Sequence, residues 1–434
     1  MVSGEETAEL FFALNPYLAE FILFLRRFKK MKKWLSLILA VSFIVSAFAG
    51  CGEKPDENSS SMPDVTIETS SSEASSEPSK ESTDLTLDHT MELKYAELFK
   101  VDYLSDGFKL LTVDDKENYK AEILLVPEGK EAPKKSSFIN ENTIILNAPL
   151  NNMLVSSTPV VSLINAFGSL DTVTMSTYEA DSWYIDEVKN ATEDGKIKYV
   201  GHYKEPDFEM IAAEKPDFAI FSTMLQQVPE VEAKLKELGV KILLDQSSSE
   251  AHPMARTEWM MFYAALLNKE TEAEKEFEKQ CEVFEAIKTP EGEKENAVIF
   301  YITSKNVLHA RRGGDYMAKM LELAGGEYIF ADVEPNKTGT VKMDFETFYD
   351  KAKDADNIIY VWSLGGKPET LGDFTAKNEL FKDLKAVKEG NVWCTTPDYF
   401  QRTNVMGDMI SEFNKVLTMD EVDESKLQYL FKLK

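Results

Sequence analysis

The sequence has few of the residues on which several large classes of protein depend. Its 434 residues include 48 basic and 75 acidic side chains, giving a net charge of -27, so it lacks the basic surface that binds nucleic acids. Its three cysteines form neither a disulfide framework nor a CxxC pair, and its four histidines are widely scattered. It contains no GxSxG, P-loop, HExxH or glycine-rich dinucleotide motif. We therefore expect no nucleic-acid partner, no enzymatic activity, no bound metal and no cofactor.

A secretory signal is predicted near the start of the chain. Residues 31–51 read MKKWLSLILAVSFIVSAFAGC, in which a basic start precedes an apolar run and small residues. The apolar run is about 16 residues long, shorter than the roughly 20 that a bilayer-spanning helix needs. A signal is therefore favoured over the alternative, an uncleaved membrane anchor. The signal region is residues 1–50, of which residues 1–30 are interpreted as a wrongly assigned start.

The end of this region resembles the lipobox of bacterial lipoproteins. The resemblance rests on Phe48-Ala49-Gly50-Cys51, and it implies that Cys51 is lipidated and becomes the mature N-terminus. The following residues are rich in Ser, Glu and Pro and poor in large apolar side chains, so they cannot offset the entropy cost of folding. Residues 51–92 are predicted to be the lipidated cysteine and a flexible tether.

The remainder reads as an α/β chain. Short apolar runs bounded by turn residues predict strands at 99–103, 108–113, 121–126 and 143–146. From residue 157 helical and strand patterns alternate, which indicates βαβ units and mainly parallel sheets.

One stretch divides the folded part in two. Residues 253–288 predict a helix of about 35 residues with a possible kink at Asn268, and such a helix would span a domain. A similar pattern lies on each side of it: DFEMI and then PDFAIF from Asp207, and DFETF and then ADNIIYV from Asp344. We expect two lobes, residues 93–250 and 289–434, joined by a connecting helix at 251–288, with a cleft between them.

The ordered series of motifs resembles a known family. FGSLDTVTMST, KIKYVGHYKEPDFEMIAAEKPDFAIFST and LKELGVKILL precede the helix, and ENAVIFYIT, DYMAKMLELAGGEYIFAD, MDFETFYDKAKDADNIIYVWS and DLKAVKEGNVWCTTPDYF follow it. Together they resemble the helix-backbone class of ABC-importer substrate-binding proteins, over roughly residues 93–434. The resemblance implies a bilobal solute-binding fold and a metal-chelate ligand of the ferric siderophore, haem or corrinoid type. It also implies that one acidic residue per lobe docks on the permease, and by motif position these are Glu209 and Glu346.

Ligand residues are expected on loops at the carboxyl ends of the strands, where open α/β sheets bind ligands. Aromatic rings there would offer flat surface, and arginines would offer forked donors to anionic groups. The alternatives are ordinary core aromatics, surface arginines paired with nearby acids, and a histidine that only caps the helix. The candidates are Tyr178, Glu179, Trp183, Tyr184, Thr223, His252, Arg256, Arg311, Arg312, Tyr316, Trp362, Phe400 and Arg402.

The sequence therefore predicts a monomeric, lipid-anchored receptor on the extracytoplasmic face of the membrane. It would capture a metal chelate, with a ferric siderophore favoured, and pass it to an ABC permease and its ATPase. Two alternatives stay open. One is a receptor that binds bare zinc or manganese directly, for which His202, His252 and His309 are available. The other is a cell-surface interaction lipoprotein without a small ligand.

Overall fold

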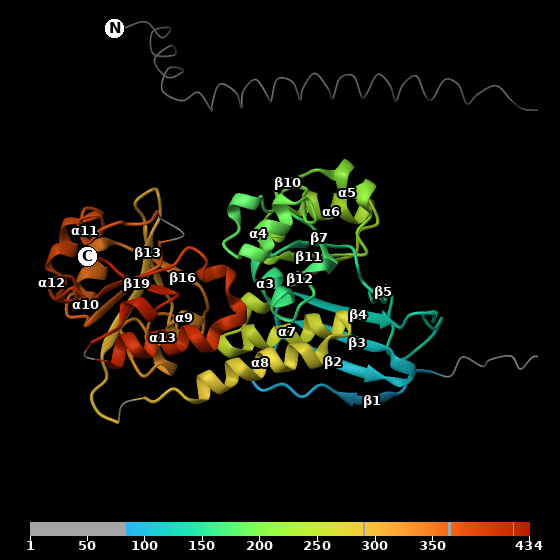
Figure 1. Cartoon of the computed structure of the whole chain (residues 1–434), viewed down its shortest axis with the longest axis horizontal. Helices are drawn as coiled ribbons and strands as arrows, with labels where there is room; N and C mark the ends of the chain where they lie inside the picture. The colour runs from blue at the N-terminus through green and yellow to red at the C-terminus, as the bar shows by residue number, and fades with distance from the viewer. Residues whose placement is uncertain (1–83, 290, 363–365, 420) are drawn as a thin grey trace, which may run out of the picture. The chain divides into compact units, whose positions relative to one another are not determined.

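The computed structural model describes residues 84–289, 291–362, 366–419 and 421–434. These residues form an N-terminal sheet, two α/β lobes and a helical hairpin (Figure 1). The predicted signal region, the lipidation site Cys51 and the first part of the tether lie outside the described residues. Within the described ranges no helix combines the length and the apolarity needed to cross a bilayer.

The N-terminal sheet has five strands in the order β1 to β5: β1 (Leu87–Thr90), β2 (Phe99–Leu104), β3 (Lys109–Asp114), β4 (Lys120–Val126) and β5 (Ile144–Asn147). All neighbours are antiparallel except β4 and β5, which are parallel. The predicted strands at 99–103, 108–113, 121–126 and 143–146 are confirmed as β2 to β5. The tether prediction is wrong for residues 84–92, because Leu85 is buried and β1 pairs with β2.

The N-lobe is built on a fully parallel sheet of order β12-β11-β6-β7-β8. Helices cover it, so its central strands are buried on both faces and read as continuous apolar runs. Its elements are β6 (Met153–Ser156), α3 (Thr158–Ala166), β7 (Val173–Ser176), α4 (Asp186–Glu193), β8 (Lys198–Tyr199), β9 (Gly201–His202), β10 (Glu205–Pro206), α5 (Phe208–Glu214), β11 (Phe218–Ser222), α6 (Pro229–Glu237) and β12 (Ile242–Asp245).

The C-lobe has a mixed sheet of order β16-β14-β13-β17-β18-β19, with β15 paired to β13. Its centre is parallel, whereas β14, β16 and β19 run antiparallel to their neighbours. Its elements are β13 (Asn296–Ile302), β14 (Leu308–Arg311), α9 (Tyr316–Leu323), β15 (Glu327–Tyr328), β16 (Thr340–Met343), α10 (Phe345–Ala352), β17 (Asn357–Tyr360), α11 (Leu371–Thr375), α12 (Lys385–Glu389), β18 (Val392–Thr395), α13 (Met406–Thr418) and β19 (Leu430–Lys432).

The predicted single connecting helix is wrong. The segment forms two helices, α7 (Pro253–Leu267) and α8 (Glu270–Glu285), separated by Asn268 in the left-handed conformation with φ 54°. The chain reverses there, because the ring of His252 before α7 lies 6.1 Å from that of Phe284 near the end of α8. The connection is therefore a helical hairpin rather than a rod. Two α/β lobes are present, but the range predicted for the N-lobe, residues 93–250, also includes most of the separate N-terminal sheet. The two helices and α13 lie along one side of both lobes (Figure 1).

Close packing between α8 and α13 requires one glycine. A Cβ on Gly407 would lie 2.3 Å from the backbone oxygen of Gln280, so no larger residue fits without moving a helix. The side chain of Gln280 also donates to Asp408 at 2.8 Å. The hairpin is thus fixed to the C-lobe through α13.

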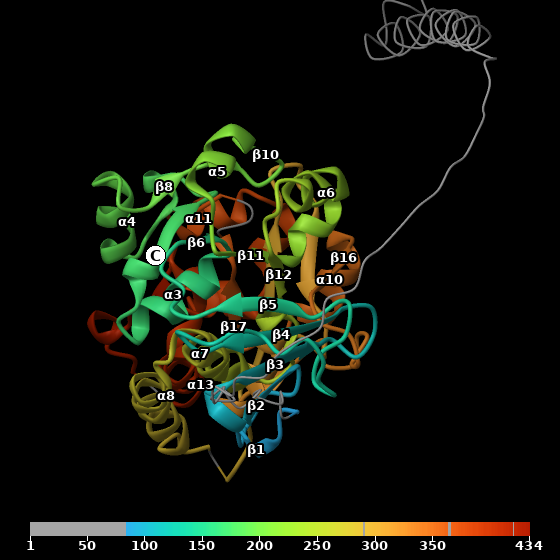
Figure 2. The ribbon, with the colours of Figure 1, turned by 90° about the vertical axis from the view of Figure 1, so that its right-hand side faces the viewer.

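The N-terminal sheet packs against the hairpin and lies beside the N-lobe in both views (Figures 1 and 2).

Buried charged side chains hold the N-terminal sheet against the hairpin. Both carboxylate oxygens of Glu258 on α7 accept from the backbone N–H groups of residues 94–96, at 2.6–2.7 Å. Glu250 accepts from two further backbone N–H groups, at 3.1 and 3.0 Å, and from the Trp259 indole at 3.0 Å. Lys109 of β3 donates to the Ala265 carbonyl at 3.0 Å and to Asn268 at 2.8 Å. We call this contact the sheet–hairpin interface.

The predicted internal repeat is confirmed as structure. Asp207 caps α5, which leads into β11, and Asp344 caps α10, which leads into β17. Their carboxylates accept from the backbone N–H groups of Met210 and Thr347 at 2.9 and 2.8 Å. The two lobes therefore share one local plan.

Candidate functional site: a basic, aromatic cavity between the lobes

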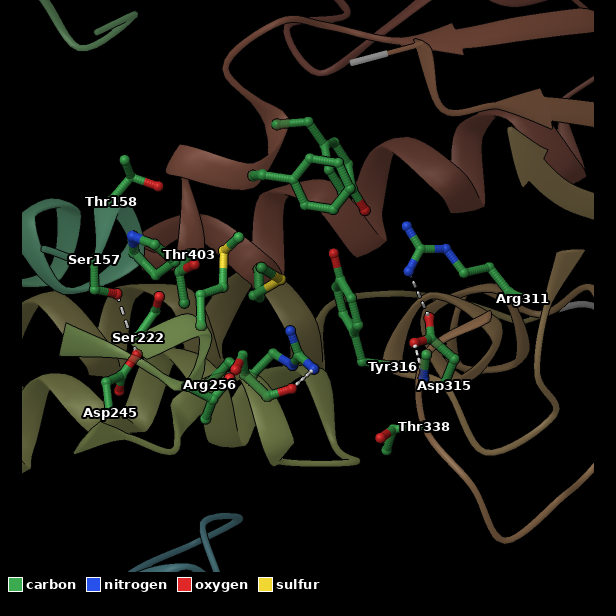
Figure 3. Close-up of a pocket in the computed structure, with 18 of the residues that line it drawn as sticks. Ser157, Thr158, Ser222, Asp245, Arg256, Arg311, Asp315, Tyr316, Thr338 and Thr403 are labelled. Atoms are coloured by element: carbon green, nitrogen blue, oxygen red, sulfur yellow. Dashed lines mark hydrogen bonds and ion pairs between the residues drawn. The ribbon is translucent and has the colours of Figure 1, made fainter. Parts of the chain in front are cut away.

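A cavity of about 390 Å³ lies between the two lobes (Figure 3). The N-lobe contributes residues that follow the carboxyl ends of its parallel strands, the edge at which open α/β sheets bind ligands. The C-lobe contributes the end of β14, the start of α9 and the segment after β18. The lining residues are Ser157, Thr158, Pro159, Tyr178, Ser222, Thr223, Met224, Asp245, Ser248, Arg256, Arg311, Asp315, Tyr316, Thr338, Gly339, Tyr399, Phe400, Thr403 and Met406.

Arg256 enters the cavity from the first turns of α7. Its Nε donates to the Glu250 carbonyl at 3.1 Å and its Nη2 donates to the Ser248 carbonyl. Its guanidinium carbon lies 3.6 Å from the centre of the Tyr316 ring, a close cation–π contact. Burial lowers the pKa of the guanidinium, and the positive charge of Arg311 acts in the same direction. An anion bound in the cavity would offset both costs.

Arg311 lines the cavity from the C-lobe, and Figure 3 shows Tyr316 between the two guanidinium groups. Burial opposes the charge on Arg311, but Asp315 raises the pKa of the guanidinium above its usual value. The pairing with Asp315 is loose, at 3.6 Å from Nη1 to Oδ1. Asp315 is instead held by the backbone N–H groups of Met317 at 3.0 Å and Gly339 at 2.9 Å. Its main role is to cap α9 and to hold the 338–339 loop.

A buried polar cluster closes the N-lobe side. Asp245, at the end of β12, accepts from the Tyr263 hydroxyl at 2.7 Å and from the Ser247 hydroxyl at 2.9 Å. It also accepts from the Ser247 backbone N–H at 3.1 Å and from the Ser157 hydroxyl at 3.2 Å, and the latter contact fixes the start of α3. Burial raises the pKa of Asp245. This carboxyl is satisfied within the protein, so it acts as support rather than as a ligand group.

The wall that carries Tyr399 and Phe400 belongs to the C-lobe but is fastened to the N-lobe. Gln401 donates to the Ser182 carbonyl at 2.7 Å and accepts from the Tyr184 N–H at 2.9 Å. Arg402 pairs with Asp398 at 2.9 Å and reaches the Tyr184 carbonyl at 3.5 Å. Tyr184 and Arg402, two predicted ligand residues, thus join the lobes beside the cavity and do not line it.

Several predicted ligand residues line the cavity, and others lie outside it. Those in the lining are Tyr178, Thr223, Arg256, Arg311, Tyr316 and Phe400. Trp183 is buried against Tyr178, with ring centres 5.5 Å apart, so it supports the wall from behind. Glu179 is exposed and faces Tyr199, and Trp362 is half-buried at the edge of the core.

The two remaining candidates are held by other contacts. His252 accepts from the Met254 N–H at 3.2 Å as the cap of α7 and stacks on Tyr95 at 4.7 Å. Arg312 pairs with Glu334 and donates to the Thr338 carbonyl at 2.9 Å. These contacts are the capping and surface-pairing alternatives that the sequence left open.

Sequence reasoning missed the small and polar part of the lining. Ser157, Thr158 and Pro159 open α3 directly after β6, and Thr338 and Gly339 lie on the loop before β16. For the α3 residues a signal existed, since a Ser-Thr-Pro sequence after an apolar strand predicts a helix N-terminus at a strand end. Nothing in the sequence singles out Thr338 or Gly339.

The described residues contain no group of three His, Cys, Asp or Glu side chains placed to hold a metal ion. His202 is exposed and His309 stacks on Tyr301 at 4.9 Å, so the three histidines named for a zinc or manganese site have separate surroundings.

The family model described as "Periplasmic binding protein" matches residues 158–399, more than half of the chain. The chain belongs to the periplasmic binding protein family. This match confirms the family resemblance and the bilobal α/β fold class that were inferred from the sequence. Members of the family are binding proteins. The match begins after the N-terminal sheet and β6.

Known relatives and structures agree with this assignment. The binding protein is 26% identical over 388 residues to the uncharacterized lipoprotein MJ0878 of Methanocaldococcus jannaschii, covering 86% of this chain and 89% of that one. A periplasmic binding protein from Veillonella parvula superposes with a TM-score of 0.51 at 19% identity, covering 70% of this chain and 97% of the other. The petrobactin-binding protein YclQ from Bacillus subtilis gives 0.50 at 16% identity, covering 62% and 93%. At such identities the two structures bear on the fold alone.

Proposed function

We propose that this protein is the lipid-anchored receptor of an ABC importer and that it captures a metal chelate, with a ferric siderophore as the leading candidate. The observation that carries the proposal is the cavity itself: two buried arginines and four aromatic rings converge between two lobes. Rings suit the flat surface of a chelate or macrocycle, and arginines suit its anionic groups.

Titration of the full-length chain in detergent tests the proposal. Trp183 packs on Tyr178, which lines the cavity, so ligand binding should change tryptophan fluorescence. Ferric siderophores, haem and cobalamin are the test ligands, and zinc and manganese are the controls. We expect at least one chelate to bind at micromolar concentration or below. A response to the bare ions alone would favour a direct metal receptor, and no response to any of them would favour an interaction lipoprotein.

The ligand role extends, as a proposal, to the predicted residues that line the cavity. Tyr178, Tyr316 and Phe400 would supply ring surface, Thr223 a hydroxyl, and Arg256 and Arg311 the positive charge. The fastening through Gln401 and the hairpin connection support limited closure on ligand rather than a wide clamshell motion.

Membrane anchoring through Cys51 is proposed from the lipobox and from a relative that is named a lipoprotein. The intact mass of the membrane-extracted protein tests it. A mature chain that begins at a lipid-modified Cys51 is expected, and a chain that retains residues 1–50 would contradict the proposal.

Glu209 and Glu346 are proposed to dock on the permease. Each is exposed in the first turn of a helix of the internal repeat, α5 in one lobe and α10 in the other. The double change Glu209→Arg and Glu346→Arg should abolish uptake in cells and leave ligand affinity unchanged. The double change Glu187→Arg and Glu379→Arg is the matched control, because both residues are acidic and lie in the first turns of other helices. This control should leave uptake unchanged. Normal uptake by the double Glu209 and Glu346 variant would disprove the docking role.

A further inference from the structure

Arg256 is held in the cavity by one short loop, residues 248–252, which we call the pre-α7 loop. Its Nε donates to the Glu250 carbonyl at 3.1 Å and its Nη2 donates to the Ser248 carbonyl. The remaining nitrogen, Nη1, has no acceptor among the described residues and is not fully buried, so it is open to a ligand. The guanidinium carbon lies 3.6 Å from the centre of the Tyr316 ring (Figure 3). This placement depends on where the pre-α7 loop holds its two carbonyls.

The pre-α7 loop is held in turn by residues 94–98, which connect β1 to β2 of the N-terminal sheet and precede the residues matched by the family model. The buried Glu250 side chain accepts from two backbone N–H groups of this segment at 3.1 and 3.0 Å, and from the Trp259 indole at 3.0 Å. At the end of the loop the ring of His252 stacks on that of Tyr95, with centres 4.7 Å apart and planes 13° apart. The segment therefore contacts the loop at two points.

Glu258 binds the same segment but supplies no acceptor to Arg256. Its carboxylate accepts from the backbone N–H groups of residues 94–96 at 2.6–2.7 Å, whereas the acceptors of Arg256 are the carbonyls of the pre-α7 loop. Glu250 is bonded on both sides, because its carboxylate receives the segment and its carbonyl receives the arginine. The two buried glutamates thus differ in their connection to the cavity.

We propose that Glu250 is a positioning residue for ligand binding: its carboxylate ties the pre-α7 loop to residues 94–98, and the loop holds Arg256 where Nη1 meets a negatively charged group of the cargo. The inference rests on the proposed function and adds the N-terminal sheet to the parts of the chain that determine affinity. Position matters because a hydrogen bond to a charged group contributes about 1.5–3 kcal/mol and weakens steeply when its donor is misaligned. A guanidinium already fixed by the protein also loses less rotamer entropy on binding.

The affinity of the full-length chain for anionic chelates tests the inference. The probes are ferric citrate, ferric enterobactin and haem, with ferrichrome as an uncharged comparison. Complete loss of the hydrogen bond from Arg256 would weaken binding about 10- to 150-fold. We expect Glu250→Ala, which only displaces the donor, to weaken the tightest anionic probe about 5- to 20-fold and ferrichrome by less than about twofold. Glu250→Gln keeps an accepting oxygen and should restore affinity to within about twofold.

A double-mutant cycle shows whether Glu250 acts through Arg256. Arg256→Met should itself weaken the anionic probes, and in that background Glu250→Ala should change their affinity by less than about twofold. Equal losses from Glu250→Ala in both backgrounds would overturn the inference. If Glu250→Ala fails to fold, Tyr95→Leu enters the same cycle, because it loosens the end of the loop; a loss of about two- to fivefold is expected, and no loss would overturn the inference.

Glu258→Ala is the matched control. It should lower the melting temperature and, at temperatures where the variant is folded, leave the affinity for anionic probes unchanged. A loss of affinity equal to that of Glu250→Ala would show that any damage to the sheet–hairpin interface weakens binding, and would overturn the specific role of Glu250.

The crystal structure of unliganded Glu250→Ala tests the inference without any ligand. We expect the guanidinium of Arg256 to move by about 1 Å or more relative to the Tyr316 ring, a displacement large enough to cost affinity. A guanidinium that stays in place would overturn the inference. Ferrichrome bound more tightly than every anionic probe would also overturn it while leaving a chelate receptor in place. Binding of zinc or manganese alone would instead remove the proposed function, and the inference would fall with it.

Discussion

The buried charges of the sheet–hairpin interface and those of the cavity differ in how completely they are paired. Glu258 and Glu250 each receive three N–H donors, and Lys109 has acceptors from the hairpin. Arg311, equally buried, keeps two N–H groups without a partner in the described residues. A buried charge with several hydrogen-bond partners within the protein stabilises the fold, whereas Arg311 lines the cavity with its hydrogen-bonding capacity only partly used. The number of hydrogen-bond partners therefore distinguishes the buried charges that stabilise the fold from the buried charge that lines the cavity.

Of the changes that test this comparison, removal of the Glu258 carboxylate should have the largest effect on the free energy of unfolding. Glu258→Ala removes the acceptor of the N–H groups of residues 94–96, which are part-buried, and each lost hydrogen bond to a charged group contributes about 1.5–3 kcal/mol. We expect the free energy of unfolding to fall by about 3 kcal/mol or more in urea denaturation. Glu278→Ala, an exposed change on α8, should alter it by less than about 0.5 kcal/mol. A small effect at Glu258 would mean that the interface is not held by its buried charges.

Removing the positive charge of Arg311 should leave the free energy of unfolding unchanged or raise it, whereas removing Glu258 should lower it. Arg311→Met replaces a buried, poorly paired cation by an apolar side chain of similar length, a kind of change that is often neutral or stabilising. We expect the unliganded protein to be unchanged or more stable by up to about 2 kcal/mol, and anionic chelates to lose affinity. Thermal melting with and without ligand measures both. Destabilisation by several kcal/mol would make Arg311 a structural residue like Glu258.

A smaller effect is expected from the titration of Glu250. Burial raises the pKa of this carboxyl, so its contribution to stability is present below its ordinary value of 4.5 and is lost as the pH rises through the folded-state value. Glu250→Gln keeps an oxygen at the position that accepts all three N–H groups and removes the titration. The variant should therefore gain stability relative to the wild type as the pH increases from 4.5 to 7.5. A difference that is flat across this range would show that Glu250 is not perturbed.

Much of the fold could be predicted because it depends on local patterns. The strands 99–103 to 143–146 and the repeat at Asp207 and Asp344 are set by apolar runs and helix caps, which short segments encode. The hairpin could not be read in the same way, since the helical periodicity continues on both sides of the reversal. Two weak signals were present at the break: Asn268 is a residue that tolerates the left-handed conformation, and Glu270 and Glu272 suit a new first turn.

The site was only partly predictable for a different reason. Residues shortly after a parallel strand, such as Tyr178 and Thr223, follow from the rule that ligands bind at strand ends. Arg311 does not, because it ends β14, which runs antiparallel to its neighbours. The rule does not tell which of two adjacent side chains turns inward, so Arg311 and Arg312 were equivalent in the sequence and differ only in the structure. Nor does it reveal contacts between distant segments, such as Gln401 with Ser182 and Tyr184, which turn predicted ligand residues into a fastening between lobes.

The position of iron in the protein is the most direct test of the account. Crystals of the chain grown with its tightest ferric chelate would give an anomalous signal at the iron absorption edge. We predict one iron site inside the cavity between the lobes, surrounded by chelator atoms. An iron site elsewhere on the molecule, or a metal bound directly by protein side chains, would contradict it.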